Sequence, residues 1–507
     1  MSWVDDWGLS LATFLPAVGV VVLMFLPAAR EQLVKITGTL FAGLALFAGI
    51  LCAVRFDLGA TDQIQLEVDS TWIESIGARY HVGVDGMSLP LLLLSLLVCF
   101  LCMVYMWWHI PAPGKPKAFF GLVLLLETGM NGTFVALDLI LFFIFFELVL
   151  VPMYFMIGIW GGPNRDYASV KFFLYTLFGS IFMLLGFLAL WINSGAETFD
   201  MIALRDTTAD ASELFQNLVF LGLFLGFAIK VPMWPFHTWL PDAHTEAPTV
   251  GSVLLAAVLL KMGTYGFIRI ALPILPDAAV TFAPVIGILA VIGIIWGSLC
   301  CFAQTDLKRL IAFSSVGHMG FVMLGIATLT DEGINGAIFG MVAHGLITGM
   351  LFFLAGSMHE RYHTREIAAL GGMLKSMPRF GSIFSLAAIA SLGLPGLAGF
   401  WGEMLALLGS YQPAEGLNVE LFRVLMVVAG IGTVLTAGYL LWMVQRVNMG
   451  VVPEKFASGT GVFDVHRLEW VSWTPLLLLI VVGGLYPALV TNVTTGAVQN
   501  LTRIFGG

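Results

Sequence analysis

Residues 226–252, GFAIKVPMWPFHTWLPDAHTEAPTVGS, carry a lysine and several prolines directly after an apolar run. Pro232 and Pro235 remove backbone hydrogen-bond donors, so we expect a helix to be interrupted just after Lys230. A charge at the centre of a bilayer costs about 2.5–3.5 kcal/mol on insertion scales, so a lysine there requires a partner or a function. The alternative is a lysine near a helix end whose ammonium group reaches the membrane interface.

The whole chain has the composition of an integral membrane protein. Of its 507 residues, 59% are hydrophobic and 11% are charged, and the mean hydropathy is +0.94. A soluble domain cannot bury this much apolar surface. Residues 1–28 contain Asp5 and Asp6 in place of a basic segment, so we expect a first membrane span there and no cleavable signal peptide.

The hydropathy pattern predicts an all-α polytopic membrane protein with about 14 transmembrane helices. We expect them at residues 8–28, 34–55, 88–108, 118–134, 136–159, 168–192, 217–236, 250–272, 282–303, 309–330, 335–358, 380–410, 422–446 and 470–492. Fifteen of the 23 basic residues fall in loops on one side and six on the other, while Lys230 and Lys261 lie within apolar spans. The positive-inside rule therefore places both termini on the periplasmic side of a bacterial cell inner membrane.

A second interrupted span is expected at residues 391–410, SLGLPGLAGFWGEMLALLGS. Pro395 and its neighbouring glycines break the run, and Glu403 follows the break. Two broken segments, each with one ionisable residue, are typical of inverted-repeat transporters. We therefore predict two inverted five-helix repeats, each with a discontinuous helix. The predicted units are residues 1–117 (helices 1–3), 118–272 (first repeat), 273–446 (second repeat) and 447–507 (C-terminal loop and helix 14).

Other ionisable residues also lie in predicted spans. Glu147, in LFFIFFELVLVPMYF, is surrounded by apolar residues and needs a cationic partner or a proton. His318 and His344 fall on consecutive spans, and imidazoles suit proton relay near neutral pH, although a lone buried histidine is more often simply hydrogen-bonded. Together with Lys230, Lys261 and Glu403, these three residues would give a chain of acids, bases and imidazoles across six spans.

Three further polar residues lie near a turn or a break of the predicted spans. Glu127 and Asp138 lie close to a predicted outward turn, where we expect solvated or interfacial carboxylates. His237 follows the first break, and a loop residue and a proton-uptake group are equally good interpretations of it. Cys99 and Cys102 form a CxxC without other thiols or histidines nearby, so we interpret them as small buried hydrophobic residues.

The run AIKVPMWPFHTWLPDAHTEAPTVGSVLLAAVLLKMGTYG at residues 228–266 resembles the signature of the antiporter-like subunits of respiratory complex I and of Mrp-type cation/proton antiporters. FFELVLVPMY, TDLKRLIAFSSVGHMG, AHGLITGMLFFLAGSMHERYHTREIAALGGM and LPGLAGFWGEM are similar to the M branch of that family in particular. Glu403 also points to that branch, because the related L and N branches typically carry lysine at this place.

This resemblance implies a proton-translocating subunit of an NADH:quinone oxidoreductase. Glu147 and Lys230 would form a carboxylate-lysine pair, Lys261 and His318 the central link, His344 a further relay, and Glu403 the terminal proton site. We expect no cofactor and no metal in this chain; FMN, iron-sulfur clusters and quinone would lie in or between partner subunits. The expected partners are other membrane-arm subunits, especially the neighbouring L and N subunits, and membrane lipid, with no nucleic acid.

Two other functions fit parts of the pattern. A sodium/proton antiporter, alone or in an Mrp complex, would share the buried charged residues, and co-purification would distinguish it. A membrane oxidoreductase with a haem held by His318 and His344 would leave the buried lysines and glutamates without a role.

Overall fold

The computed structural model describes residues 2–195, 197–208, 211–454 and 463–506. Twelve helices in these ranges are long and apolar enough to cross a membrane. They are α1 (Ser2–Phe25), α2 (Glu31–Arg55), α4 (Pro116–Val135), α5 with α6 (Leu139–Leu148, Leu150–Trp160), α7 (Arg165–Asn193), α9 (Glu213–Lys230), the segment from α11 to α13 (Thr249–Ile274), α14 (Pro276–Phe302), α15 (Leu307–Ala327), α16 (Asp331–Tyr362), α20 (Val419–Asn448) and α22 (Arg467–Leu485).

The remaining helices are shorter. One of them, α3 (Leu89–Tyr105), is strongly apolar. Helices α18 (Pro378–Ser391) and α19 (Gly399–Tyr411) follow each other across a break. The others are α8 (Met201–Thr208), α10 (Trp239–Glu246), α17 (Met373–Ser376) and α23 (Ala488–Thr502), with short 3-10 turns η1 (Glu74–Ile76), η4 (Ile367–Ala369) and η5 (Arg503–Phe505). The chain is thus a mostly helical membrane protein, as predicted, and each of the fourteen predicted spans overlaps a helix.

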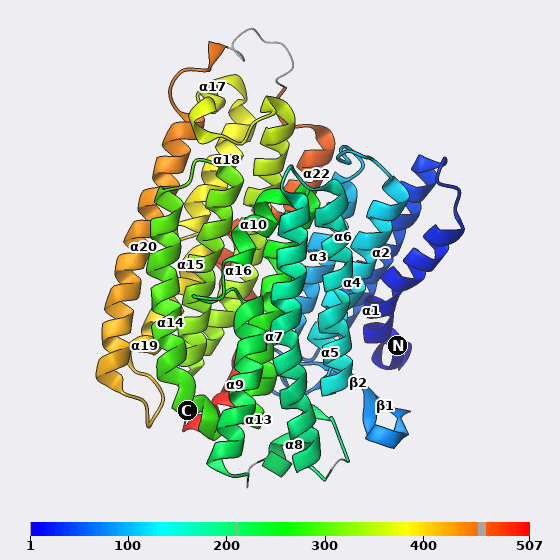
Figure 1. Ribbon diagram of the computed structural model, residues 1–507, viewed down its shortest axis with the longest axis vertical. Helices are drawn as coiled ribbons and strands as arrows, with labels where there is room; N and C mark the ends of the chain where they lie inside the picture. Colours follow the sequence, from blue (N-terminus) through cyan, green and yellow to red (C-terminus); the bar gives the residue numbers. More distant parts are fainter. Residues whose placement is uncertain (1, 196, 209–210, 455–462, 507) are drawn as a thin grey trace.

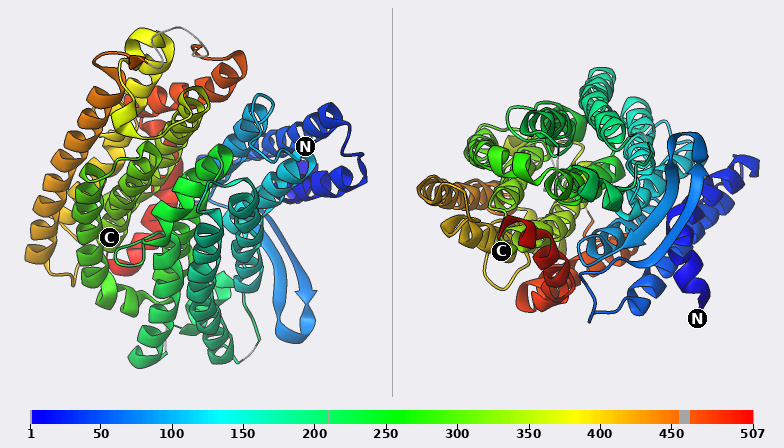
Figure 2. Two further views of the ribbon diagram at one scale, coloured as in Figure 1. Left: turned by 45° about the horizontal axis from the view of Figure 1, so that its top comes forward. Right: turned by 90° about the horizontal axis from the view of Figure 1, so that it is seen from below.

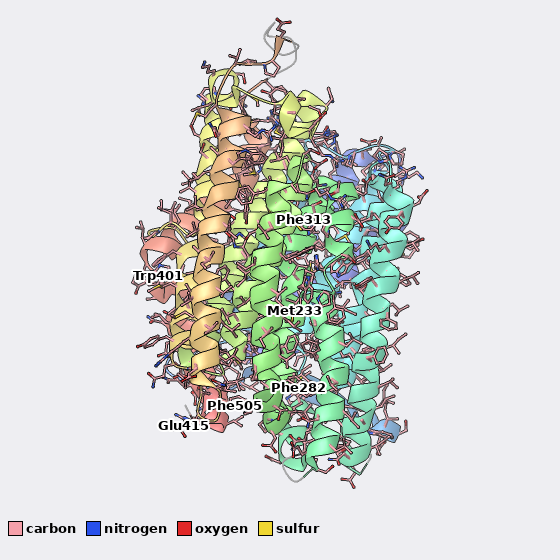
Figure 3. All side chains as sticks on the ribbon, turned by 60° about the vertical axis from the view of Figure 1, so that its left-hand side comes forward. Met233, Phe282, Phe313, Trp401, Glu415 and Phe505 are labelled. Atoms are coloured by element: carbon pink, nitrogen blue, oxygen red, sulfur yellow. The ribbon has the colours of Figure 1, made fainter. Side chains whose placement is uncertain are left out.

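Both predicted interruptions are present. The first helix ends at Lys230, and α10 begins at Trp239 after an irregular stretch. The second break separates α18 from α19, where Gly393 and Gly396 have positive φ angles of 80° and 95°. Met233, in the first break, and Trp401, just after the second, both lie near mid-height of the bundle (Figure 3). Polar backbone is therefore exposed inside the bundle at the depth where a membrane-spanning path needs it.

The last predicted span, residues 470–492, is wrong in its extent. Helix α22 stops at Leu485, and α23 starts at Ala488. Pro487 cannot donate a backbone hydrogen bond, so the helix is broken there. The Gly484 carbonyl, in the last turn of α22, accepts a hydrogen bond from Trp401 Nε1 at 2.8 Å, which ties α22 to the start of α19.

A β-hairpin was not predicted. Strands β1 (Gln65–Ile73) and β2 (Ala78–Val84) pair antiparallel and lie across the lower face of the molecule (Figure 2). Both termini lie in the half of the molecule that carries this hairpin and α8, while α17 marks the opposite end (Figure 1). The end with α17 is the one whose loops are rich in lysine and arginine.

The helices divide into an outer layer and a buried centre. Large apolar side chains are exposed on α1, α2, α7 and α20, as lipid-facing or subunit-facing surfaces require. The segment from α11 to α13 is buried along its whole length, and α16 packs against it, against α15 and against α19. These buried helices carry most of the predicted site residues.

Candidate functional site

Lys261 lies at the centre of the bundle on a helix with two π-helical stretches. Helix α12 (Leu260–Gly266) is flanked by η2 (Leu255–Leu259) and η3 (Phe267–Ala271). Such π-helical turns are rare and often mark functional sites, and Lys261 Nζ donates a hydrogen bond to a carbonyl in one of them, that of Ala256. The local helix geometry therefore holds the lysine in the protein interior, where it is 0% exposed.

Two close polar contacts, separated by a gap between two histidine rings, lead from Lys261 to Glu403. Lys261 Nζ lies 2.6 Å from Nδ1 of His344 on α16. The rings of His344 and His318 are 5.7 Å apart between centroids, and Nδ1 of His318 lies 3.2 Å from Oε1 of Glu403 on α19. His344 is the direct partner of the lysine, and His318 stands between His344 and Glu403, so the expected link of Lys261 to His318 would run through His344.

His318, His344 and Glu403 share one small cavity of about 30 Å³, which Ser391 and Gly399 also line. A cavity needs about 10–15 Å³ on this measure to hold a water molecule, so this one has room for one or two. Its polar lining includes His344 Nε2 and Glu403 Oε2, which have no hydrogen-bond partner. A water molecule in this cavity could therefore connect the two histidine rings.

Gly393 permits the position of Glu403. A Cβ atom added at Gly393 would lie 3.1 Å from Glu403 Oε2. The break between α18 and α19 thus brings bare backbone against the carboxylate. Ser391, the last residue of α18, lies with its Oγ 3.0 Å from His318 Nε2, which fixes the ring from the other side.

Lys230 and Glu147, both within the described residues, interact electrostatically but do not form an ion pair with each other. Lys230 Nζ has no hydrogen-bond partner, and neither has Glu147 Oε1. The ammonium group instead lies 4.7 Å from the ring centre of Phe146, the residue before Glu147. The predicted pair is therefore separated here, with an aromatic face beside the lysine.

Two site residues were missed by the sequence reasoning. His244 on α10 is fully buried, is stacked on Phe352 with ring centroids 4.4 Å apart, and has no partner on either ring nitrogen. It lies within electrostatic range of both Lys261 and Lys308. Lys308 is one of the fifteen basic residues that the sequence assigns to loops of the basic side, yet it is only 4% exposed and donates to the Ala247 carbonyl.

Lys308 lines a cavity of about 250 Å³ at the end of the molecule with the basic loops. The other titratable groups in its lining are Tyr105, His109, Glu246, His359, Glu360 and Arg365. His109 Nε2 and Glu360 Oε1 form an ion pair at 3.1 Å. This cavity, Lys308 and His244 together give polar groups between the basic face and Lys261.

The expectations about five further residues can now be compared with the structure. The expectation that Glu127 is a solvated or interfacial carboxylate is wrong. Its side chain is 0% exposed inside α4, and neither carboxylate oxygen has a hydrogen-bond partner. Asp138 does lie at a helix start, where it caps α5, but it is also fully buried. His237 lies in the first break and is 5% exposed. Cys99 and Cys102 are fully buried, as expected.

The arrangement suits proton transfer between side chains. Imidazole nitrogens both donate and accept protons, and lysine and glutamate can begin or end such a series. Among the described residues, no group of three or more His, Cys, Asp or Glu side chains is placed to hold a metal ion.

Comparison with known proteins places this architecture in a family. Residues 136–435 match the family described as NADH:quinone oxidoreductase/Mrp antiporter, transmembrane region. NADH-quinone oxidoreductase subunit M of Rickettsia bellii is 40% identical over 97% of this chain and 98% of its own length.

Two solved structures are similar over nearly the whole chain. A chain of respiratory complex I from Thermus thermophilus superposes with a TM-score of 0.85 at 31% identity, covering 98% of this chain and 100% of that one. A chain of the Mrp complex from a Dietzia species shares the fold, with a TM-score of 0.82 at 20% identity over 98% of each chain. This chain therefore belongs to the NADH:quinone oxidoreductase/Mrp antiporter membrane family and, within it, to the subunit M group of NADH-quinone oxidoreductases.

Proposed function

We propose that this subunit moves protons through the series Lys261, His344, His318 and Glu403, driven by quinone reduction in partner subunits. The observation that carries the proposal is the pair of contacts Lys261–His344 and His318–Glu403, whose two histidines line one cavity. A buried charge series of this kind is costly to keep unless it has a function.

Glu147 and Lys230 are proposed as the control pair of the first half. Their unpartnered atoms leave them free to approach each other or to separate. A carboxylate near a lysine stabilises the ammonium form, and its withdrawal favours proton release. His244 and Lys308 supply protons to Lys261 from the cavity at the basic face in this scheme.

The same proposal assigns the translocase part of the reaction to this chain. Its sequence has no G-x-G-x-x-G fingerprint, P-loop or thiolate cluster. FMN, iron-sulfur clusters and quinone would therefore be bound in or between other subunits. The neighbours we propose are subunits L and N, with membrane lipid around the exposed apolar helices. The basic face would lie in the cytoplasm of a bacterial cell, with both termini periplasmic.

The predicted units remain part of the proposal. Residues 118–272 and 273–446 would be the two inverted repeats, between the N-terminal helices of residues 1–117 and the C-terminal segment 447–507. One interrupted helix in each of the two units supports this division.

The experiment is a Lys261→Ala variant of the assembled oxidoreductase in proteoliposomes. We expect the complex to assemble on native gels and to lose NADH-driven proton translocation. Lys375→Ala, in the short helix α17 at the basic face, is the control and should pump normally. Full pumping by an assembled Lys261→Ala complex would remove Lys261 from the path.

A further inference from the structure

Below Lys261, the same helix carries a second buried group of polar side chains that the proposed path does not use. Tyr265 and Arg269 follow Lys261 at intervals of four residues, so all three lie on one face of the helix. Arg269 is 2% exposed, in η3, on the side of the β-hairpin. At 1.5 Å per residue, it lies about 12 Å from Lys261 along the helix axis.

The guanidinium group of Arg269 is fixed by two contacts. Its Nη2 donates to Asp85 Oδ1 at 2.6 Å, and its Nε donates to Tyr265 Oη at 2.9 Å. Asp85 Oδ1 also accepts backbone hydrogen bonds from Met87 and Ser88 at the start of α3. Arg269 is thus held beneath Lys261 by residues from two different parts of the chain.

Two hydrogen bonds of this group run in one direction, from Arg269 through Tyr265 to the Phe134 carbonyl. Tyr265 Oη donates its proton to the Phe134 carbonyl at 3.0 Å and accepts from Arg269. A guanidinium group has only donors and keeps its charge in proteins. A proton arriving from Lys261 therefore meets a hydroxyl that is already engaged and then a fixed positive charge.

A second arginine adds to this charge. Arg205 of α8 lies near Arg269, and its Nε is buried without a partner. Burial lowers the pKa of Arg205, and the proximity of Arg269 lowers it further. Among the described residues, Asp85 is the one carboxylate that pairs with Arg269.

We infer that Arg269, held by Asp85 and Tyr265, is an electrostatic barrier that stops protons on Lys261 from leaking directly to the hairpin side. Fixed arginine charges exclude protons from other membrane pores in this way. With this outward route closed, the proton on Lys261 is left with the route to His344, 2.6 Å away. The inference rests on the proposed path through Lys261, and it assigns Arg269 a role in coupling while the proton relay remains with the other groups.

The test measures passive proton leak in proteoliposomes that contain the whole oxidoreductase complex. A potassium diffusion potential is imposed without NADH, and a trapped pH dye reports proton entry into the lumen. The Arg269 charge repels a proton at Lys261, about 12 Å away. At an effective dielectric constant of about 20, this repulsion slows proton passage by about tenfold. We therefore expect Arg269→Met to raise the leak about tenfold or more and to lower the protons moved per NADH.

Two matched variants separate charge from packing. Arg269→Lys keeps the charge, and Asp85→Asn breaks the ion pair while keeping the guanidinium group. Neither variant should raise the passive proton leak. Equal leaks from all three variants would indicate a packing defect and overturn the barrier. An Arg269→Met complex with an unchanged passive leak and an unchanged number of protons moved per NADH would overturn it as well.

A double variant tests the route of the leak. Lys261→Ala combined with Arg269→Met should abolish the extra leak, because the barrier acts on protons that come from Lys261. If the leak persists, the barrier is refuted. The proposed path itself is judged separately, by NADH-driven pumping of Lys261→Ala in the presence of Arg269.

Discussion

Single residues decide how charge is held inside this membrane protein. Lys230 has an aromatic ring at 4.7 Å and no hydrogen-bond partner, while Glu147 Oε1 is also free. No ion pair among the described residues holds either charge, although Ser180 interacts with Glu147. In the proposed function, the distance between the two groups controls the protonation of both.

We expect Glu147→Gln and Lys230→Ala each to abolish pumping without preventing assembly. Glu147→Asp keeps the charge on a shorter side chain and should be milder. NADH-driven proton uptake in proteoliposomes measures the effect, with native gels as the check on assembly. Wild-type pumping by both neutral variants would make the two residues purely structural.

Two glycines in the second break allow a controlled comparison. Gly393 and Gly396 both have positive φ, so alanine at either costs about 1–2 kcal/mol of backbone strain. A Cβ at Gly393 also meets the Glu403 carboxylate at 3.1 Å, whereas one at Gly396 meets only Leu485 at 3.8 Å. Thermal stability should fall equally, but Gly393→Ala should lose far more proton pumping. Equal pumping in the two variants would contradict the role of Glu403.

The sequence offered six candidates because each is an ionisable residue within a predicted membrane span: Glu147, Lys230, Lys261, His318, His344 and Glu403. It missed Lys308 and His244 for a physical reason. Lys308 follows a capping Asp306 at a helix start, which resembles an exposed helix end, yet other helices cover it. Burial by neighbouring helices leaves no trace in the local sequence.

At the scale of elements, the hairpin is attached to the bundle by a histidine. His81 of β2 has Nε2 at 2.7 Å from Glu67 of β1, and its Nδ1 contacts Asp200 next to α8. Carboxylates only accept hydrogen bonds, so both ring nitrogens donate and the ring is protonated. Burial alone would lower the pKa of His81, but Asp200 and Glu67 outweigh it and raise the pKa.

This contact predicts a pH-dependent hairpin. The pKa of His81 is higher in the folded state, so its stabilisation is full at low pH and is lost as the pH rises through the raised value. Amide exchange in β1 and β2, corrected for its intrinsic pH dependence, should accelerate over that window. His81→Gln should flatten the response; an unchanged response in this variant would exclude the histidine as its cause.

Helix positions and both breaks could be predicted because hydropathy and proline act locally. The hairpin could not be predicted, because β1 is mostly polar and its pairing depends on β2 and the bundle. The separate helix α23 was also missed: Pro487 was read as part of a span, and α23 is stabilised by packing against α16.

At the scale of the whole molecule, the two faces differ in charge and in structure. The basic loops gather at the end with α17, and the hairpin, α8 and both termini lie toward the other (Figure 1). A periplasmic reporter enzyme fused after residue 506 should therefore be active, and the same reporter in the loop after Asn448 should be silent. The opposite pattern would reverse the orientation.

The central claim is that Glu403 loads and releases a proton at the end of the series. The most direct measurement is the number of protons translocated per NADH by assembled complexes carrying Glu403→Gln, with Glu403→Asp and the loop variant Glu415→Gln as controls. Glutamine keeps the shape but cannot exchange a proton, so translocation and the coupled quinone reduction should both collapse. Glu403→Asp should retain part of the activity, and Glu415→Gln all of it. An assembled Glu403→Gln complex that moves the full number of protons per NADH would contradict the account.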